Sequence, residues 1–370
     1  MLKEKQVYEV KKHLEKAQNP VFFFDNDPDG LCSFLILYRS YEKGKGVPVK
    51  GSQIEDYFRK VNEFNSDYIF ILDKPEVSEE FFRKAREINI PVVWIDHHFI
   101  EKEKIPEDIS YFNPFFNYLE ELDNQDKERT EEDLKKIVGE PVTALCYQIT
   151  QRKEDLWIAV AGCVSDMYLP DFYNEFLEKY PDLGIEKFDS VSDIYYNSGV
   201  GTIVKLMSNG LKDKTTNVIM MLKFISNSKT PYEFINESEK NRFFHSRSQE
   251  IESRKNKLVE RAKILANSEP DNKILFFEYG GNLSISSDLS NKLRYLFPEK
   301  VIVVIYNKGD GESNISIRGK NIREILLKSI EGIDGANGGG HEDAVGLRIK
   351  TEDIPFFKKR FSEKISADNC

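Results

Sequence analysis

The stretch FFFDNDPDGLCS, residues 22–33, decides the fold of the N-terminal part of the chain. Three phenylalanines run directly into Asp25, Asp27 and Asp29, which are spaced two residues apart. An apolar run without alternation is typical of a strand that is buried on both faces of a parallel sheet. Gly30 allows a turn after the acids, and LCSF begins a predicted helix. Three carboxylates this close together need an opposite charge, so the stretch predicts a cation site at the end of a strand.

Three further apolar runs lack alternation in the same way. They are YIFILD (68–73), PVVWID (91–96) and WIAVAGCVSD (157–166), and each ends in an aspartate, as does the first run: Asp25, Asp73, Asp96 and Asp166. Charged amphipathic segments such as SEEFFRKAREIN (78–89) separate the early runs, which is the βαβ rhythm of a parallel sheet. Ligands of open α/β sheets bind at the carboxyl ends of the strands. We therefore expect the four aspartates to gather at one sheet edge.

The 370 residues are enough for two domains. We predict a parallel-sheet α/β domain over 1–236, a long connecting helix over 237–268 and a smaller α/β domain over 269–370. The connecting helix is expected because residues 237–263 are polar and charged without Gly or Pro. Strands of the last domain are predicted in KILFFEY, NLSIS, VIVVIYN, ESNISIRG and DAVGLRIK, and helices in SSDLSNKLRYLF, NIREILLKSI and the C-terminal tail. The acidic segment 117–138 is predicted to be a helical surface insertion.

Composition narrows the class of protein. The formal net charge of -10 argues against a generic nucleic-acid binder but allows a nuclease that holds phosphate through metal ions. The cysteines Cys32, Cys146, Cys163 and Cys370 form no CxxC pair, which indicates neither a zinc site nor a disulfide framework. Apolar runs of membrane-span length and an apolar signal core are both missing, so we expect a cytoplasmic protein without a membrane partner.

Two motifs indicate the chemistry. WIDHHF places Asp96, His97 and His98 at a strand end beside the other acids. Carboxylates with one or two imidazoles suit Mn²⁺ or Mg²⁺ better than zinc, and two such ions commonly serve phosphate-ester hydrolysis. The second motif is GANGGGHEDAVG (335–346), in which glycines 338–340 are expected to form a loop that exposes backbone N–H groups to an anion, with Arg318 of SIRG able to fork onto a phosphate.

Taken in order, DNDPDG, FILD, IDHH, GCVSD, SIRG and GGGH resemble the motifs of the DHH–DHHA1 phosphoesterase superfamily, and within it the archaeal RecJ-like exonucleases of the GINS-associated type. The resemblance implies a cleft between the two domains. It implies two Mn²⁺ or Mg²⁺ ions with Asp73 bridging them, Asp25 as an additional acid near them, Asp96 orienting His97, and His98 facing the scissile phosphate. The implied metal ligands are Asp27, Asp29, Asp73, His97 and Asp166. The implied substrate-binding residues are Ser316, Arg318, Gly338, Gly339, Gly340 and His341.

Three functions stay open from the sequence. The first is hydrolysis of single-stranded DNA or RNA from the 5′ end to mononucleotides, with Phe99, Tyr168 or Phe172 available to stack bases. The second is a phosphodiesterase for short substrates: oligoribonucleotides, as for a nanoRNase, linear or cyclic dinucleotides, or 3′-phosphoadenosine phosphate. The third is a replication scaffold that binds the GINS complex, with segment 117–138 as a candidate contact.

Overall fold

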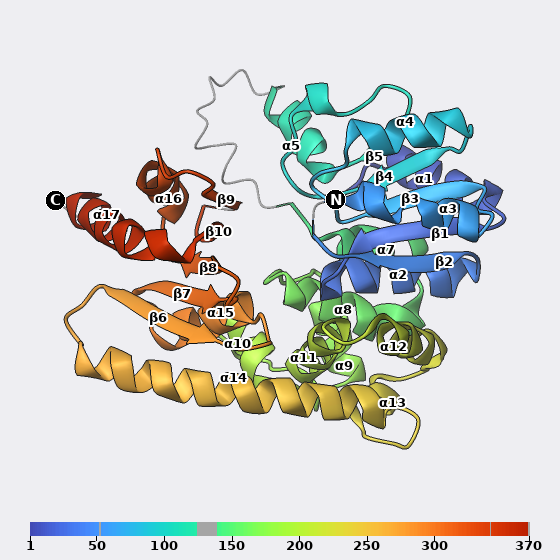
Figure 1. Cartoon of the computed structure of the whole chain (residues 1–370). Coiled ribbons are helices and arrows are strands. Elements are labelled where there is room, and N and C mark those ends of the chain that lie inside the picture. Colours follow the sequence, from blue (N-terminus) through green and yellow to red (C-terminus); the bar gives the residue numbers. More distant parts are fainter. Residues whose placement is uncertain (52, 124–138, 341, 369–370) are drawn as a thin grey trace. The chain divides into compact units, whose positions relative to one another are not determined.

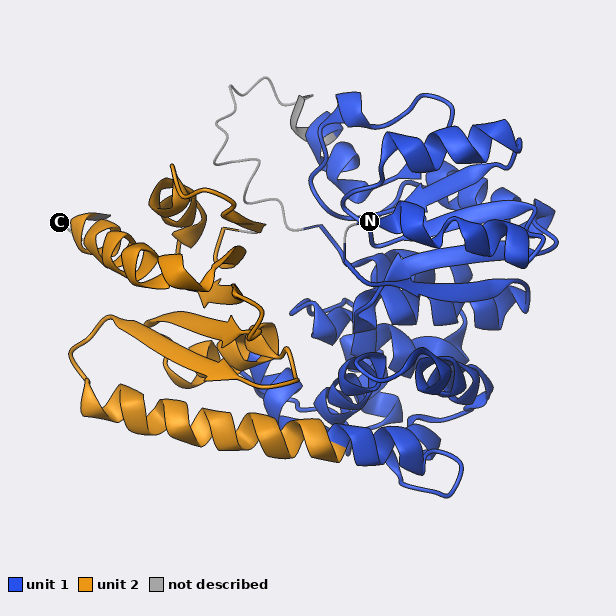
Figure 2. Cartoon of the chain, viewed as in Figure 1, with its two compact units in different colours: residues 1–248 blue, residues 249–370 orange. Residues whose placement is uncertain are grey.

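The computed structural model describes residues 1–51, 53–123, 139–340 and 342–368. The chain divides into two compact units, residues 1–248 and residues 249–370 (Figure 2). Each unit has its own sheet and its own hydrophobic core. The domain boundaries predicted from the sequence stay a prediction. Among the described segments, none of the helices combines the length and apolar character needed to cross a membrane.

The first unit is built on a sheet of five parallel strands in the order β2-β1-β3-β4-β5 (Figure 1). The strands are β1 (Pro20–Asp25), β2 (Lys45–Val49), β3 (Tyr68–Leu72), β4 (Val92–Ile95) and β5 (Ser110–Phe112). Phe22 and Phe24 of β1 belong to one core cluster, while Val21 and Phe23 belong to the other. Both faces of β1 are therefore buried, which explains why its sequence does not alternate. The three strands predicted at 20–25, 68–73 and 91–96 are confirmed.

Helices cover both faces of this sheet. The side chains of α1 (Glu4–Lys16), α2 (Pro28–Tyr41), α7 (Val142–Thr150) and α8 (Leu156–Ser165) pack on one face. The 3₁₀ turn η1 (Ile54–Tyr57), α3 (Arg59–Glu63) and α4 (Glu79–Glu87) pack on the other. The remaining elements of the unit are η2 (Lys102–Lys104), α5 (Pro114–Asp123), η3 (Lys153–Asp155), α9 (Tyr173–Lys179), α10 (Val191–Asn197), α11 (Gly199–Leu211), α12 (Thr215–Asn227) and α13 (Pro231–Ile235).

One predicted strand is wrong: WIAVAGCVSD forms helix α8, not a strand. Every residue of 156–164 is buried, so the run is apolar on all sides and carries neither the helical nor the strand period. A Cβ atom on Gly162 would lie 2.2 Å from the Thr143 hydroxyl, so glycine allows α8 to pack tightly against α7. The helical prediction for 117–138 coincides with α5 up to Asp123, and 124–138 lie outside the described residues.

The second unit holds a mixed sheet in the order β6-β7-β8-β10-β9. Only β6 and β7 run parallel; the pairs β7–β8, β8–β10 and β10–β9 are antiparallel. Helix α14 (Arg242–Ser268), which crosses the boundary between the units, and α15 pack on one face, and α16 and α17 pack on the other. The elements are β6 (Ile274–Gly280), α15 (Ser286–Leu296), β7 (Val301–Asn307), β8 (Glu312–Arg318), α16 (Ile322–Ile330), β9 (Asn337–Gly340), β10 (Ala344–Lys350), η4 (Thr351–Asp353) and α17 (Ile354–Asp368).

Two expectations for this unit are corrected. NLSIS is not a strand, because the chain leaves β6 at Gly280 and α15 begins at Ser286. The glycines 338–340 form the edge strand β9 instead of a loop, and they pair with 345–347 of β10. At Gly340, with φ 135°, a Cβ atom would lie 2.5 Å from the Ala344 carbonyl oxygen, so this strand depends on glycine there.

Candidate metal centre

The carboxyl ends of three neighbouring strands bring aspartates together. Asp25 is the last residue of β1, Asp73 follows β3 directly and Asp96 follows β4 directly. Asp73 has φ 58°, a left-handed conformation that is uncommon outside glycine, and its N–H donates to the Ile95 carbonyl at 3.0 Å. Asp25 and Asp73 border a cavity of about 310 Å³ that is lined by Asp25, Asp27, Gly51, Asp73, Lys74, Pro75, Glu76, His97, His98 and Asp166.

The start of helix α2 contributes two more acids. Asp27 is its N-cap, and the side-chain oxygen Oδ1 accepts from the Gly30 N–H at 2.9 Å. Asp29, in the first turn, is 1% exposed, and its two oxygens accept from the N–H groups of Val142 and Thr143, each at 2.9 Å. The Asp29 carboxylate therefore also satisfies the free N–H groups at the start of α7. A Cβ atom on Gly30 would lie 2.6 Å from the Asp25 carbonyl oxygen, so glycine is required there.

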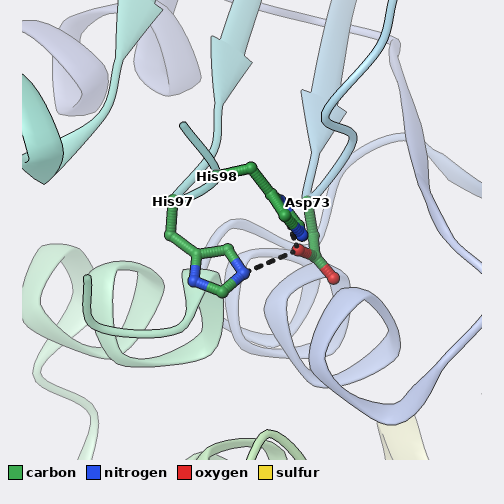
Figure 3. Close-up of side chains that lie close together, drawn as sticks. All are labelled: Asp73, His97 and His98. Carbon is green, nitrogen blue, oxygen red and sulfur yellow. Dashed lines mark ion pairs between the residues drawn. The ribbon is translucent and has the colours of Figure 1, made fainter. Parts of the chain in front are cut away.

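His97 joins these acids to the end of helix α8. Its Nε2 atom lies 3.4 Å from Oδ1 of Asp73 and 3.6 Å from Oδ2 of Asp166 (Figure 3 shows Asp73 with both histidines). Asp166 is the C-cap residue of α8. The sequence places Asp166 correctly beside the other acids, but the element that delivers it is a helix.

His98 has a different partner. Its Nδ1 atom lies 2.9 Å from Oδ1 of Asp96 and 3.8 Å from Oδ1 of Asp73. The expected pairing of Asp96 with His97 is therefore wrong, because Asp96 contacts His98. The Asp96 side chain is fully buried, and its Oδ2 atom has no hydrogen-bond partner among the described residues.

Lys74 is a member of the site that the sequence reasoning missed. Its Nζ atom donates to Oδ1 of Asp25 at 2.8 Å and to the Gly51 carbonyl at 2.8 Å, and its side chain is 5% exposed. In the sequence, Lys74 follows Asp73 of FILD directly, and this position could have suggested a place in the site. A lysine between an aspartate and Pro75 is equally typical of a turn, so the pattern alone does not decide. Thr143 had no signal at all, because only the fold brings α7 to Asp29.

The electrostatics of the site favour positive charge. Burial raises the pKa values of Asp27 and Asp29 well above the usual range, and the neighbouring Asp73 raises them further. Burial also raises the pKa of Asp25, and Lys74 opposes that change. Burial disfavours charge on His97, yet Asp73 and Asp166 outweigh it and raise the pKa of His97 well above its usual value. Burial opposes the ionised form of Asp73 as well, but His97 lowers its pKa. Buried acids in this state bind protons or cations readily.

Oxygen and imidazole donors lie close enough to hold metal ions. Two groups have ligand atoms within 4.8 Å of one another: Asp73 with His97 and His98, and Asp29 with His97 and Asp166. The groups share His97. Such donor sets suit Mn²⁺ or Mg²⁺, so the residues fit the metals that the sequence implies. Among the described residues, neither group includes Asp25 or Asp27.

The predicted substrate-binding residues lie in the second unit. Arg318, the last residue of β8, donates from Nε to Oδ1 of Asn291 at 2.6 Å and from Nη2 to the Ser287 hydroxyl at 2.9 Å. The Ser316 hydroxyl donates to Ser286 at 2.9 Å. In the sheet register, Ser316 pairs with Gly346, which pairs in turn with Gly339, so the serine and the glycines share one region of the sheet. His341 lies outside the described residues.

Comparison with known families agrees with this architecture. Residues 21–124 match the DHH family, N-terminal domain, and residues 271–367 match the DHHA1 domain. The first match lies within the first compact unit and the second within the second unit, so the order of the two matched domains agrees with the two units of the structure. No curated protein sequence matches the chain.

Solved structures show the same fold. RecJ in complex with Mn²⁺ from Thermus thermophilus has a TM-score of 0.63 at 15% identity over 98% of this chain, which spans 54% of that RecJ. An exonuclease RecJ bound to manganese has a TM-score of 0.62 at 15% identity, covering 98% of this chain and 94% of that one. CDC45 from Entamoeba histolytica has a TM-score of 0.59 at 11% identity, covering 98% and 99%. At these identities the likeness shows the fold.

Proposed function

We propose that this chain is a phosphodiesterase that uses two divalent cations, Mn²⁺ or Mg²⁺, and that it removes nucleotides from the 5′ end of single-stranded DNA or RNA, as a RecJ-like exonuclease. The observation that carries the proposal is the pair of ligand groups that share His97, directly beside the Asp96–His98 contact. The RecJ structures that share the fold hold Mn²⁺ or Mg²⁺, which supports the choice of metal.

The chain's own residues have separate tasks in this proposal. Asp29, Asp73, His97 and Asp166 would hold the cations, with Asp27 beside them. His98 also lies near Asp73, but we assign it to proton transfer because its Nδ1 atom is closer to Asp96 than to Asp73. When bound, the cations would supply positive charge that stabilises the phosphate oxygens during hydrolysis. Asp96 accepts a hydrogen bond from His98 Nδ1, which fixes the ring, and we propose that the His98 imidazole exchanges a proton with the leaving oxygen. The His98 side chain is 23% exposed, so substrate can reach it.

Phe99 is the aromatic residue best placed to stack a base. It follows His98 directly and is 64% exposed, with its ring 5.1 Å from that of Phe115. Phe172 packs against the core and against Tyr147 instead, so it is the weakest of the three aromatic candidates. We propose that a nucleobase next to the scissile phosphate stacks on Phe99.

A second candidate is a phosphodiesterase for short substrates such as oligoribonucleotides or dinucleotides. The cavity of about 310 Å³ and the net charge of -10 favour it over a long, basic strand-binding path. A role only as a replication scaffold that binds GINS is less well supported, because it would leave a buried cluster of like charges without a purpose.

A degradation assay tests the proposal. End-labelled DNA and RNA of two nucleotides and longer, in both polarities, would be incubated with Mn²⁺ and with a chelator. We expect Mn²⁺-dependent release of mononucleotides from the 5′ end, with no product when the metal is removed. Turnover of dinucleotides with little activity on long strands would instead select the short-substrate candidate.

The matched variants are Asp73→Ala and Asp56→Ala. Asp73 is buried in the centre, whereas Asp56 is exposed on η1. Asp73→Ala should reduce hydrolysis to background and weaken Mn²⁺ binding, while Asp56→Ala should behave like the unaltered protein. Full activity of the Asp73→Ala protein would refute the two-metal proposal.

A further inference from the structure

The metal centre already contains one cation that belongs to the chain. The Lys74 side chain is 5% exposed, and its Nζ atom lies 2.8 Å from Oδ1 of Asp25 and 2.8 Å from the Gly51 carbonyl oxygen. Lysine is almost never buried to this extent unless its charge is paired. An ammonium group is therefore a fixed part of a cavity whose other ionisable lining residues are acids and histidines.

The backbone holds Lys74 in this place. It follows Asp73, whose left-handed φ of 58° sets the direction of the chain after β3. The indole Nε1 of Trp94, which is buried in β4, donates to the Lys74 carbonyl at 3.0 Å. Lys74 is thus anchored to β4 through its backbone, and to β1 and to Gly51 after β2 through its side chain.

Lys74 contacts an acid that belongs to neither ligand group. Asp29, Asp73, His97, His98 and Asp166 each offer an atom to one of the two groups, whereas, among the described residues, Asp25 and Asp27 do not. Asp25 differs from Asp27 in that its carboxylate accepts from the Lys74 ammonium, while the Asp27 carboxylate accepts from the Gly30 N–H at the start of α2. Oδ1 of Asp25 is taken by the ammonium, and the Asp25 side chain is 34% exposed, compared with 4% for Asp73.

The number of charges at the site also explains why a lysine is needed there. Asp25, Asp27, Asp29, Asp73 and Asp166 are five carboxylates at one site, since Asp96 pairs with His98. Two divalent cations would leave one of these negative charges without a counter-charge. Lys74 supplies it, so the cluster with two cations and the ammonium is neutral. Buried charge of one sign without compensation is strongly unfavourable.

We propose that Lys74 is a positioning residue that fixes the metal-binding set: it holds Asp25 in an ion pair, and Asp25 therefore does not coordinate either cation. This inference rests on the proposed two-metal function. It also assigns Asp25 the role of counter-ion to Lys74.

Counting bound Mn²⁺ tests the inference without an activity assay. Free Mn²⁺ would be titrated by electron paramagnetic resonance against the unaltered protein, Asp25→Asn, Lys74→Met, the double variant and Lys74→Arg. We expect two Mn²⁺ per chain in the unaltered protein and still two in Asp25→Asn, with weaker affinity because Lys74 loses its counter-ion. Lys74→Met should bind Mn²⁺ about tenfold more tightly, since a nearby positive charge is removed. The double variant and Lys74→Arg should resemble the unaltered protein.

The outcomes separate the two proposals. Loss of one Mn²⁺ in Asp25→Asn would show that Asp25 is a ligand and would overturn the inference, whereas the two-metal function would stand. If the unaltered protein binds no Mn²⁺, or if Asp73→Asn binds as much as the unaltered protein, both fail. Circular dichroism would check that each variant is folded. If Lys74→Met does not fold, the Mn²⁺ count of Asp25→Asn still decides.

Discussion

His97 and His98 are neighbours in the sequence and their ring centroids lie 4.3 Å apart, yet their shortest contacts are with different acids. His97 Nε2 lies 3.4 Å from Asp73 and 3.6 Å from Asp166, while His98 Nδ1 lies 2.9 Å from the buried Asp96 and 3.8 Å from Asp73. We infer that His97 serves the metals and His98 serves proton transfer.

The variant Asp96→Asn tests this division. An amide in place of the carboxylate no longer stabilises His98 as a proton donor, and we expect kcat to fall at least about 100-fold, the lower range of general acid–base effects. The number of bound Mn²⁺ should not change, because Asp96 belongs to neither ligand group. His97→Asn is the matched comparison and should reduce Mn²⁺ binding. If Asp96→Asn also lost Mn²⁺, the two histidines would not have separate tasks.

The predictability of individual site residues depends on how each reaches the site. Asp25, Asp73 and Asp96 were accessible from the sequence because strand ends of a parallel sheet share an edge. The partner of Asp96 was not, since which neighbouring histidine turns toward it depends on the backbone just after the strand. Thr143 approaches Asp29 through the packing of α7 against α2, which no local pattern encodes.

Three single elements could not be predicted correctly from the local sequence pattern. Helix α8 was mistaken for a strand because burial on all sides removes the periodicity that distinguishes the two. The edge strand β2, KGVPV, was missed because it contains Pro48 and Gly46 and is only partly buried. The edge strand β9 is predicted as a loop because glycine has no side chain to give a strand pattern. Its pairing with β10 is what defines it as a strand.

A buried ion pair joins helix α2 to the elements beneath the sheet. Arg39 Nε donates to Oδ1 of the fully buried Asp155 at 2.6 Å, and Nη1 donates to the carbonyls of Ile225 and Ser228 at the end of α12. Arg39→Met would remove the donor that Asp155 and these carbonyls share, and would leave Asp155 with the more distant Arg152, whose Nη1 lies 3.7 Å from its Oδ2. We expect the free energy of unfolding to fall by about 3–5 kcal/mol in urea denaturation.

The control for that variant is Arg83→Met on α4. Arg83 pairs with Glu80 and Glu87, but all three side chains are about half exposed. Exposed ion pairs contribute little, so the loss should stay below about 1 kcal/mol. Equal losses in the two variants would mean that the contacts of Arg39 with Asp155 and with the end of α12 contribute no more than an exposed ion pair.

Helix α1 provides a pH-dependent contact with the sheet. His13 Nδ1 lies 3.2 Å from the Tyr68 hydroxyl and Nε2 lies 3.1 Å from the Ser110 hydroxyl. Burial, with Lys16 nearby, lowers the pKa of His13, so the folded protein prefers the neutral ring. Its contribution to stability is complete above the unfolded pKa of about 6.5 and is lost as the pH falls through the lower folded value. Urea denaturation at pH 7.5 and 5.5 should show a smaller loss for His13→Gln than for the unaltered protein; an equal loss would contradict this assignment.

At the scale of the whole molecule, each unit carries its own part of the proposed chemistry. The first unit holds every residue of the two ligand groups, and the second holds Arg318, Ser316 and the glycine strand β9. Helices cover both faces of each sheet, so the metal-binding residues and the proposed substrate-binding residues are each supported by the hydrophobic core of their own unit. Substrate binding and metal binding should therefore be separable by mutation.

Arg318→Ala tests that separation. Its guanidinium donates to Asn291 and Ser287, and we propose that it also contacts a phosphate of the substrate. A lost charged hydrogen bond costs about 1.5–3 kcal/mol, so KM should rise about 10- to 100-fold while kcat and Mn²⁺ binding change little. Arg348→Ala is the matched control, because Arg348 lies on β10 of the same sheet but is exposed and paired with Glu312. Its KM should not change. A selective fall of kcat in Arg318→Ala would instead mean that the arginine acts on the transition state, and the second unit would then take part in the chemistry as well as in binding.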